Sequence, residues 1–173
     1  MHIEPVDKGN DLFIVSNVIQ QQTLSSLLDI DLNTYKHHGA YMQEDSLRRE
    51  LEIVAEDVFH QIKLDINAQQ NKDAFSEVLK YQVQDIGVDF WWDTPGYTID
   101  IHNDQEWIDR VLQIYLWPND INLGTVFYEN NTVRYAVPYV ANTGYLMINK
   151  GQRHGMTNPV PNNTIRLSAH CGL

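Results

Sequence analysis

The second half of the chain holds a run of short strand-like segments that no helical segment interrupts. An alternating segment at 97–104 is followed by segments rich in β-branched and aromatic residues, separated by turns of Pro, Asn, Asp and Gly, at 111–117, 124–129, 133–140, 145–150, 153–156 and 164–171. Parallel strands need a crossover between them, usually a helix, so about seven strands without one predict antiparallel pairing. We therefore expect a sandwich or jelly roll, which can hold a ligand between its two sheets.

The first half of the chain is expected to form mainly helices and strands that support the jelly-roll core. A short apolar run from residue 12 indicates a strand, and the leucines that follow it indicate a helical segment up to residue 30. Apolar residues three and four apart predict a helix over 45–67, whose other face, with Arg48 and Arg49, is expected to be solvated. From Phe75 the sequence changes to β character. The expected fold class is mainly β with N-terminal helices (α+β), in a single domain of 1–173: support in 1–85 and the jelly-roll core in 86–173.

Composition excludes several classes of partner. The net charge of −11 disfavours binding to nucleic acid or to an anionic membrane, because both depend on Lys and Arg. No apolar run is long enough to span a bilayer and no signal peptide is recognisable, so no membrane association is expected. The one cysteine, Cys171, excludes an internal disulfide framework and favours a reducing compartment. We expect a cytoplasmic protein.

The candidate chemistry lies on the alternating segment that follows the Pro95-Gly96 turn. A strand at 97–104 would place Tyr97, Ile99 and Ile101 on one face, and Thr98, Asp100, His102 and Asp104 on the other. An imidazole and a carboxylate one residue apart on one face can bind the same metal ion. His154 offers a third ligand, and Arg166 follows it by twelve residues. A second His-x-acid pair, His2 with Glu4, is set aside because we expect no strand at the N-terminus.

Two histidines and one carboxylate form the facial triad of non-heme Fe(II) oxygenases. The order His102-x-Asp104, then His154, then Arg166 resembles the Fe(II)/2-oxoglutarate-dependent dioxygenase superfamily. Pro95-Gly96-Tyr97 ahead of the motif is similar to members of the prolyl-hydroxylase-like branch. The resemblance covers roughly the second half of the chain.

The resemblance implies a double-stranded β-helix (jelly-roll) barrel flanked by supporting helices, with Fe(II) as cofactor and 2-oxoglutarate as cosubstrate. His102, Asp104 and His154 are then the catalytic metal ligands, and Arg166 holds the distal carboxylate of 2-oxoglutarate. Arg166-Leu167-Ser168 is also similar to the Arg-x-Ser signature of another branch, which implies that Ser168 shares this carboxylate. Tyr115 stands where prolyl-hydroxylase-like members place a Tyr that hydrogen-bonds the cosubstrate. The reaction is hydroxylation of an unactivated C–H bond in a peptidyl (prolyl-type) or small-molecule substrate. Gly172 stands where the DNA-repair dealkylases have a second Arg, which argues against a nucleobase substrate.

Two other hypotheses fit the same sequence. A cupin-like metalloenzyme would need the metal ligands but neither 2-oxoglutarate nor Arg166. A non-catalytic jelly-roll module that binds a peptide or sugar would use Trp91 and Trp92 as its anchors. Taken singly, each candidate residue also has an ordinary role: His102 and Asp104 as a half-buried hydrogen-bonded pair, His154 as a turn residue before a Gly, and Arg166 as a strand residue paired with one of the many acids.

Overall fold

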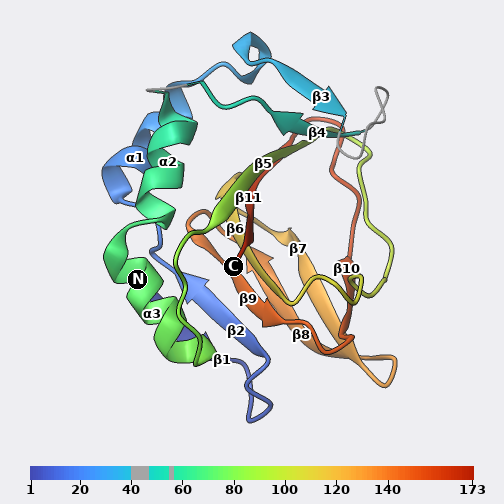
Figure 1. Ribbon diagram of the computed structural model, residues 1–173. Helices are drawn as coiled ribbons and strands as arrows, with labels where there is room; N and C mark the ends of the chain where they lie inside the picture. Colours follow the sequence, from blue (N-terminus) through green and yellow to red (C-terminus); the bar gives the residue numbers. More distant parts are fainter. Residues whose placement is uncertain (40–46, 55–56) are drawn as a thin grey trace.

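The computed structural model describes residues 1–39, 47–54 and 57–173. Two antiparallel sheets face each other, and helices cover the outer side of the larger sheet (Figure 1). Over the described residues the larger sheet has the strand order β1-β2-β9-β6-β11-β5-β4-β3, and the smaller one has the order β10-β7-β8. The strands of the larger sheet are β1 (His2–Pro5), β2 (Leu12–Ser16), β3 (His37–Gly39), β4 (Arg48–Leu51), β5 (Gly87–Asp93), β6 (Arg110–Trp117), β9 (Thr143–Ile148) and β11 (Arg166–Gly172). Those of the smaller sheet are β7 (Asp120–Glu129), β8 (Thr132–Tyr139) and β10 (Arg153–Met156).

The helical segments lie in the first half of the chain, as predicted. They are α1 (Gln21–Ser26), α2 (Val58–Ile66) and α3 (Gln69–Leu79), with two short 3-10 turns, η1 (Leu27–Asp29) and η2 (Leu32–Thr34). The strand and the helical segment expected between residues 12 and 30 are present as β2, α1 and η1. In the described part of the chain, none of the helices is long and apolar enough to cross a membrane.

Alternation along the central strands separates two apolar cores. On β6, Leu112, Ile114 and Leu116 pack toward the helices, while Val111 and Tyr115 pack between the two sheets. Burial of both faces makes the larger sheet a wall between the helical layer and the barrel interior. Side chains on the inner face of β5, β6 and β11 therefore point into the space between the sheets, where a ligand can be enclosed.

The predicted helix over 45–67 is wrong in its first part. Residues 45–46 and 55–56 lie outside the described residues, 48–51 form strand β4, and the helix begins at Val58, after Asp57 caps it by accepting from the His60 N–H at 2.7 Å. Leu47 and Leu51 are four residues apart, a spacing that a period of two also produces. Arg48, expected on a solvated face, is only 5% exposed.

Two further predictions on local structure are also wrong. Residues 75–79 belong to helix α3, where Asn71, Phe75 and Leu79 are buried four residues apart. The N-terminus, expected to form no strand, forms edge strand β1 against β2. In both places tertiary contacts outweigh local composition.

The alternating segment at 97–104 runs beside β10 but is not a regular strand. His102 and His154 exchange both backbone hydrogen bonds at 2.9 Å, an isolated bridge. In a regular antiparallel pair the N–H of Met156 would then bond to residue 100, whereas it bonds to Ile99 at 3.0 Å. One extra residue is therefore accommodated between 99 and 102, as in a β-bulge. The bulge overturns the predicted faces, because Ile99 lines the same cavity as His102 and Asp104.

Candidate metal centre

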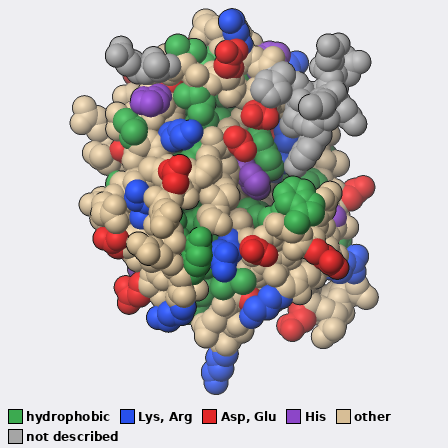
Figure 2. Space-filling model, viewed as in Figure 1, with side chains coloured by type: hydrophobic (Ala, Val, Ile, Leu, Met, Phe, Trp, Pro, Cys, Tyr) green, Lys and Arg blue, Asp and Glu red, His purple; other side chains and the backbone are tan. Residues whose placement is uncertain are grey.

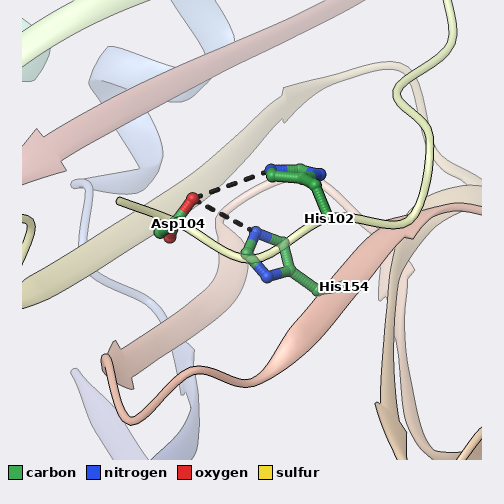
Figure 3. Close-up of side chains that lie close together, drawn as sticks. All are labelled: His102, Asp104 and His154. Carbon is green, nitrogen blue, oxygen red and sulfur yellow. Dashed lines mark ion pairs between the residues drawn. The ribbon is translucent and has the colours of Figure 1, made fainter. Parts of the chain in front are cut away.

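Three side chains predicted as metal ligands meet between the sheets (Figure 3). Asp104 Oδ1 lies 3.7 Å from His102 Nε2 and 3.6 Å from His154 Nε2. One nitrogen or oxygen atom from each residue lies within 4.8 Å of the other two. No other group of this kind occurs among the described residues. The three potential ligand atoms thus face one point, which is the requirement for binding a single ion.

The backbone around these residues fixes which ring nitrogen faces that point. The Nδ1 atom of His102 lies 2.8 Å from the carbonyl oxygen of Asp100, and that of His154 lies 3.2 Å from the carbonyl oxygen of Gln152. A carbonyl oxygen only accepts, so each Nδ1 carries the proton and each Nε2 presents a lone pair toward Asp104. This is the arrangement that orients histidine ligands in metal sites.

Gly155 allows the two segments to approach closely. A Cβ atom at this position would lie 3.0 Å from the carbonyl oxygen of Ile99 and 3.1 Å from that of Asp100. A larger residue would push β10 away from the segment that carries His102. Asn103 strengthens the same junction by donating from Nδ2 to the carbonyl oxygen of Gly151.

The electrostatics favour a carboxylate beside a neutral ring. Burial lowers the pKa of His154, which disfavours its charged form. The carboxylate of Asp104, 3.7 Å from Nε2, raises the pKa of His102. Burial opposes ionisation of Asp104, but its interactions with His102 and with the other histidines hold the pKa of this carboxyl below its usual value. Asp104 is therefore an anion at neutral pH.

A buried cation lies in the wall of the same cavity. Arg166 is 3% exposed, and its guanidinium carbon lies 4.8 Å from the ring centroid of Tyr139. Nη1 points at the sulfur of Met156, a weak acceptor, and Nε has no hydrogen-bond partner. The carboxylate of Asp93 is 3.8 Å from Nε, which is too far for a hydrogen bond. A buried guanidinium left in this state has unused capacity to bind an anion.

The structure does not bring the other two predicted cosubstrate residues to this wall. Tyr115 is fully buried, and its hydroxyl donates to Thr125 Oγ1 at 2.9 Å and accepts from the Thr125 N–H at 3.1 Å. Its ring stacks on Tyr139 at a centroid distance of 4.2 Å. Ser168 lies beside Tyr115 in the sheet, fully buried, and its Oγ has no hydrogen-bond partner. Thr125, not Tyr115, lines the cavity.

The inner cavity holds about 100 Å³ and shares part of its wall with an outer cavity of about 920 Å³. Carboxylates dominate the charged residues around the outer cavity. Figure 2 shows acidic side chains above and below a histidine near the centre of the face drawn there. Among the described residues that line it, Arg110 is the only Lys or Arg. The acidic residues of the lining are Glu50, Asp89, Asp100, Asp104 and Asp109.

Sequence reasoning missed three polar residues of the inner cavity and its border. Gln113, on β6, is 5% exposed, lines the cavity and leaves its Nε2 without a partner. Arg48 lines the cavity from β4 and binds the fully buried Asp93 at the end of β5. Asp93 could have been found from the sequence, because alternation along a strand places it on the same face as Trp91. No local signal marked Arg48, because its partner is 45 residues away.

His170 lines both cavities and stacks on Trp91 with ring centroids 4.1 Å apart. Burial, helped by the charge of Arg48, lowers the pKa of His170 to about 4. The unfolded chain therefore takes up this proton at a higher pH than the folded protein does. The contribution of neutral His170 to stability is complete above the ordinary histidine pKa of about 6.5, and it is lost as the pH falls toward 4.

We expect metal-free protein to lose up to about 3 kcal/mol of unfolding free energy through His170 between pH 7 and pH 4. His170→Gln cannot take up this proton, so its stability should depend less steeply on pH over that interval. Urea unfolding of both proteins at half-unit steps measures the difference. Parallel curves would show that His170 does not titrate in this range.

Comparison with known structures identifies the fold. Neither a scan against protein-family models nor a search of curated proteins matches the sequence. Solved structures do match: a Pseudomonas putida prolyl-4-hydroxylase has a TM-score of 0.66 at 13% identity, over 94% of this chain and 92% of that one. HygX from Streptomyces hygroscopicus, with nickel and 2-oxoglutarate bound, has a TM-score of 0.61 at 13% identity, over 94% and 82%.

A Trichoplax adhaerens prolyl hydroxylase in complex with a hypoxia inducible factor peptide fragment also matches, with a TM-score of 0.63 at 13% identity, over 95% and 83% of the two chains. The chain therefore has the double-stranded β-helix fold of the 2-oxoglutarate/Fe(II) oxygenases, and the predicted fold class is confirmed. At these identities the likeness concerns the fold, and the chemistry has to be argued from the site itself.

Proposed function

We propose that the protein is an Fe(II)- and 2-oxoglutarate-dependent oxygenase that hydroxylates an unactivated C–H bond. The observation that carries this proposal is the composition of one cavity. Its wall contains the converging atoms of His102, Asp104 and His154, and it also contains the buried Arg166, which lacks a hydrogen-bond partner at Nε. A metal site and an anion site facing one small space fit a metal-chelating dicarboxylate better than either feature alone.

The residues present fit Fe(II). Two neutral imidazoles and one carboxylate, all from one side, are the ligand set of the facial triad. Both Nδ1 atoms are held by backbone carbonyls, which fixes the rings for binding through Nε2. Fe(II), when bound there with 2-oxoglutarate, supplies the activation of dioxygen.

The chain itself positions the reactants. Arg166 would bind the distal carboxylate of 2-oxoglutarate through a charge-assisted pair, in a site whose burial strengthens the interaction. Gln113 offers an unused amide N–H to the same space. His102 and Asp104 also line the outer cavity of about 920 Å³, which gives room for a substrate beside the metal.

The substrate would be a peptide or a small molecule. The outer cavity accommodates either, and one structural neighbour was solved with a peptide fragment. Nucleic acid is disfavoured because phosphates would meet the carboxylates of Glu50, Asp89 and Asp109.

The two alternative hypotheses gain no specific support. A binding module anchored on Trp91 and Trp92 needs free aromatic faces. Trp91 lies between the guanidinium of Arg48, 4.0 Å from its ring centroid, and the stacked His170, while Trp92 is buried among core residues. A cupin-like enzyme without 2-oxoglutarate leaves the unpartnered Nε of Arg166 unexplained.

An anaerobic titration tests the proposal directly. Metal-free protein is mixed with Fe(II) and then with 2-oxoglutarate, and the weak visible charge-transfer band of the chelate is followed. We expect a saturable band that is absent without 2-oxoglutarate, followed by oxygen-dependent release of succinate. Folded protein that takes up Fe(II) but forms no band would favour the cupin-like enzyme. Folded protein that takes up no Fe(II) would favour the binding module.

A further inference from the structure

Three charged side chains lie in a row on neighbouring strands beside the inner cavity. Arg48 on β4 pairs in register with Asp93 on β5, and Asp93 pairs with Arg166 on β11. All three are buried, with exposures of 5%, 0% and 3%. Two guanidinium groups thus share one carboxylate in a place that water does not reach.

Arg48 occupies both oxygen atoms of Asp93. Its Nε donates to Oδ1 at 2.6 Å and its Nη2 donates to Oδ2 at 2.9 Å, a bidentate pair. The guanidinium carbon also lies 4.0 Å from the ring centroid of Trp91 and 4.3 Å from that of Tyr97. The guanidinium of Arg48 is therefore fixed by two hydrogen bonds and by two aromatic rings.

Arg166 donates no hydrogen bond to the same carboxylate. Its Nε is 3.8 Å from Oδ2 of Asp93 and has no hydrogen-bond partner. With two cations and one anion, the row keeps one positive charge that this carboxylate does not neutralise. If Arg48 no longer bound Asp93, this carboxylate would be the nearest one with which Arg166 could form an ion pair.

From this arrangement we propose that Arg48 is a positioning residue, which holds Asp93 off Arg166 and so keeps Arg166 available for the distal carboxylate of the cosubstrate. The inference rests on the proposed function. Arg48 acts through Asp93 and need not touch the ligand. Without Arg48, Asp93 would pair with Arg166 and compete with a dicarboxylate for the same guanidinium.

The competition predicts an unusual pattern across three variants. Arg48→Gln should weaken 2-oxoglutarate binding by about tenfold or more, because Asp93 then engages Arg166. Asp93→Asn should bind 2-oxoglutarate at least as tightly as the unchanged protein does. The double variant Arg48→Gln/Asp93→Asn should recover affinity to within about threefold of the unchanged protein, since the competing charge is gone.

The measurement is the anaerobic chelate band of the Fe(II)-loaded protein, titrated with 2-oxoglutarate and separately with 2-oxovalerate. The second ligand has the same chain length and chelating group but no distal carboxylate. Arg48→Gln should lower the affinity for 2-oxoglutarate and leave the affinity for 2-oxovalerate unchanged. A loss of packing alone would weaken both ligands together.

Several outcomes overturn the inference while the proposed function stands. In the first, Arg48→Gln loses affinity equally for the two ligands. In the second, the losses of 2-oxoglutarate affinity add up in the double variant, and in the third Asp93→Asn alone lowers this affinity tenfold. If Arg48→Gln does not fold, Asp93→Asn decides by itself, because both arginines then remain charged beside the cavity. If the unchanged protein forms no chelate with 2-oxoglutarate, the proposed function fails, and this inference fails with it.

Discussion

His154→Ala should strongly weaken metal binding and, with it, the oxygen-dependent activity proposed for the protein. His154 is the most buried of the three candidate ligands, 6% exposed, and its Nε2 lies 3.6 Å from Asp104 Oδ1. Loss of an outer-shell partner alone already weakens metal sites by about 10- to 100-fold, so we expect loss of the ligand itself to weaken Fe(II) binding at least a hundredfold. Equilibrium dialysis against Fe(II) or Co(II) measures the change.

A matched control separates ligand loss from general damage. His60 lies on α2 and outside both cavities. His60→Ala removes an imidazole from the protein without changing the site, and it should bind metal as the unchanged protein does. Circular dichroism should show that both variants fold. Tight metal binding by folded His154→Ala would remove this histidine from the ligand set.

The strands of the jelly roll were predictable because their signal is local. The segments at β6 to β11 are rich in β-branched and aromatic residues, and Asn- or Pro-rich turns separate them. The order of His102, Asp104, His154 and Arg166 could be recognised for the same reason. His154 and Arg166 lie on segments whose composition already indicated strands.

Other parts of the site depend on contacts that no local pattern records. The extra residue between Ile99 and His102 is visible only in the hydrogen bonds to β10, and it turns Ile99 into the cavity. The sequence pattern predicts a solvated helix at Arg48, whereas the side chain binds Asp93 on another strand. Tyr115, predicted to contact the cosubstrate, binds Thr125 through its hydroxyl. In each case the deciding partner is distant in sequence.

Arg166→Met should separate the binding of 2-oxoglutarate from the binding of metal. The buried guanidinium is replaced by an unbranched apolar side chain of similar length, and Asp93 keeps its bidentate pair with Arg48. Removal of Arg166 leaves Arg48 and Asp93 as a neutral, hydrogen-bonded pair, so no buried charge loses its partner and we expect the variant to fold. Fe(II) binding should be unchanged, because Arg166 is not among the three grouped ligands.

The affinity for 2-oxoglutarate should then fall by about a hundredfold, because a charge-assisted, desolvated pair contributes roughly 3 kcal/mol. Arg166→Lys keeps the charge but not the bidentate guanidinium. Its affinity for 2-oxoglutarate should lie between those of the unchanged protein and Arg166→Met. Binding of 2-oxovalerate should be the same in all three, since it has no distal carboxylate for Arg166 to hold. Unchanged binding of 2-oxoglutarate by Arg166→Met would mean that the buried charge does not hold this ligand, and the site would then fit a metalloenzyme that needs no 2-oxo acid.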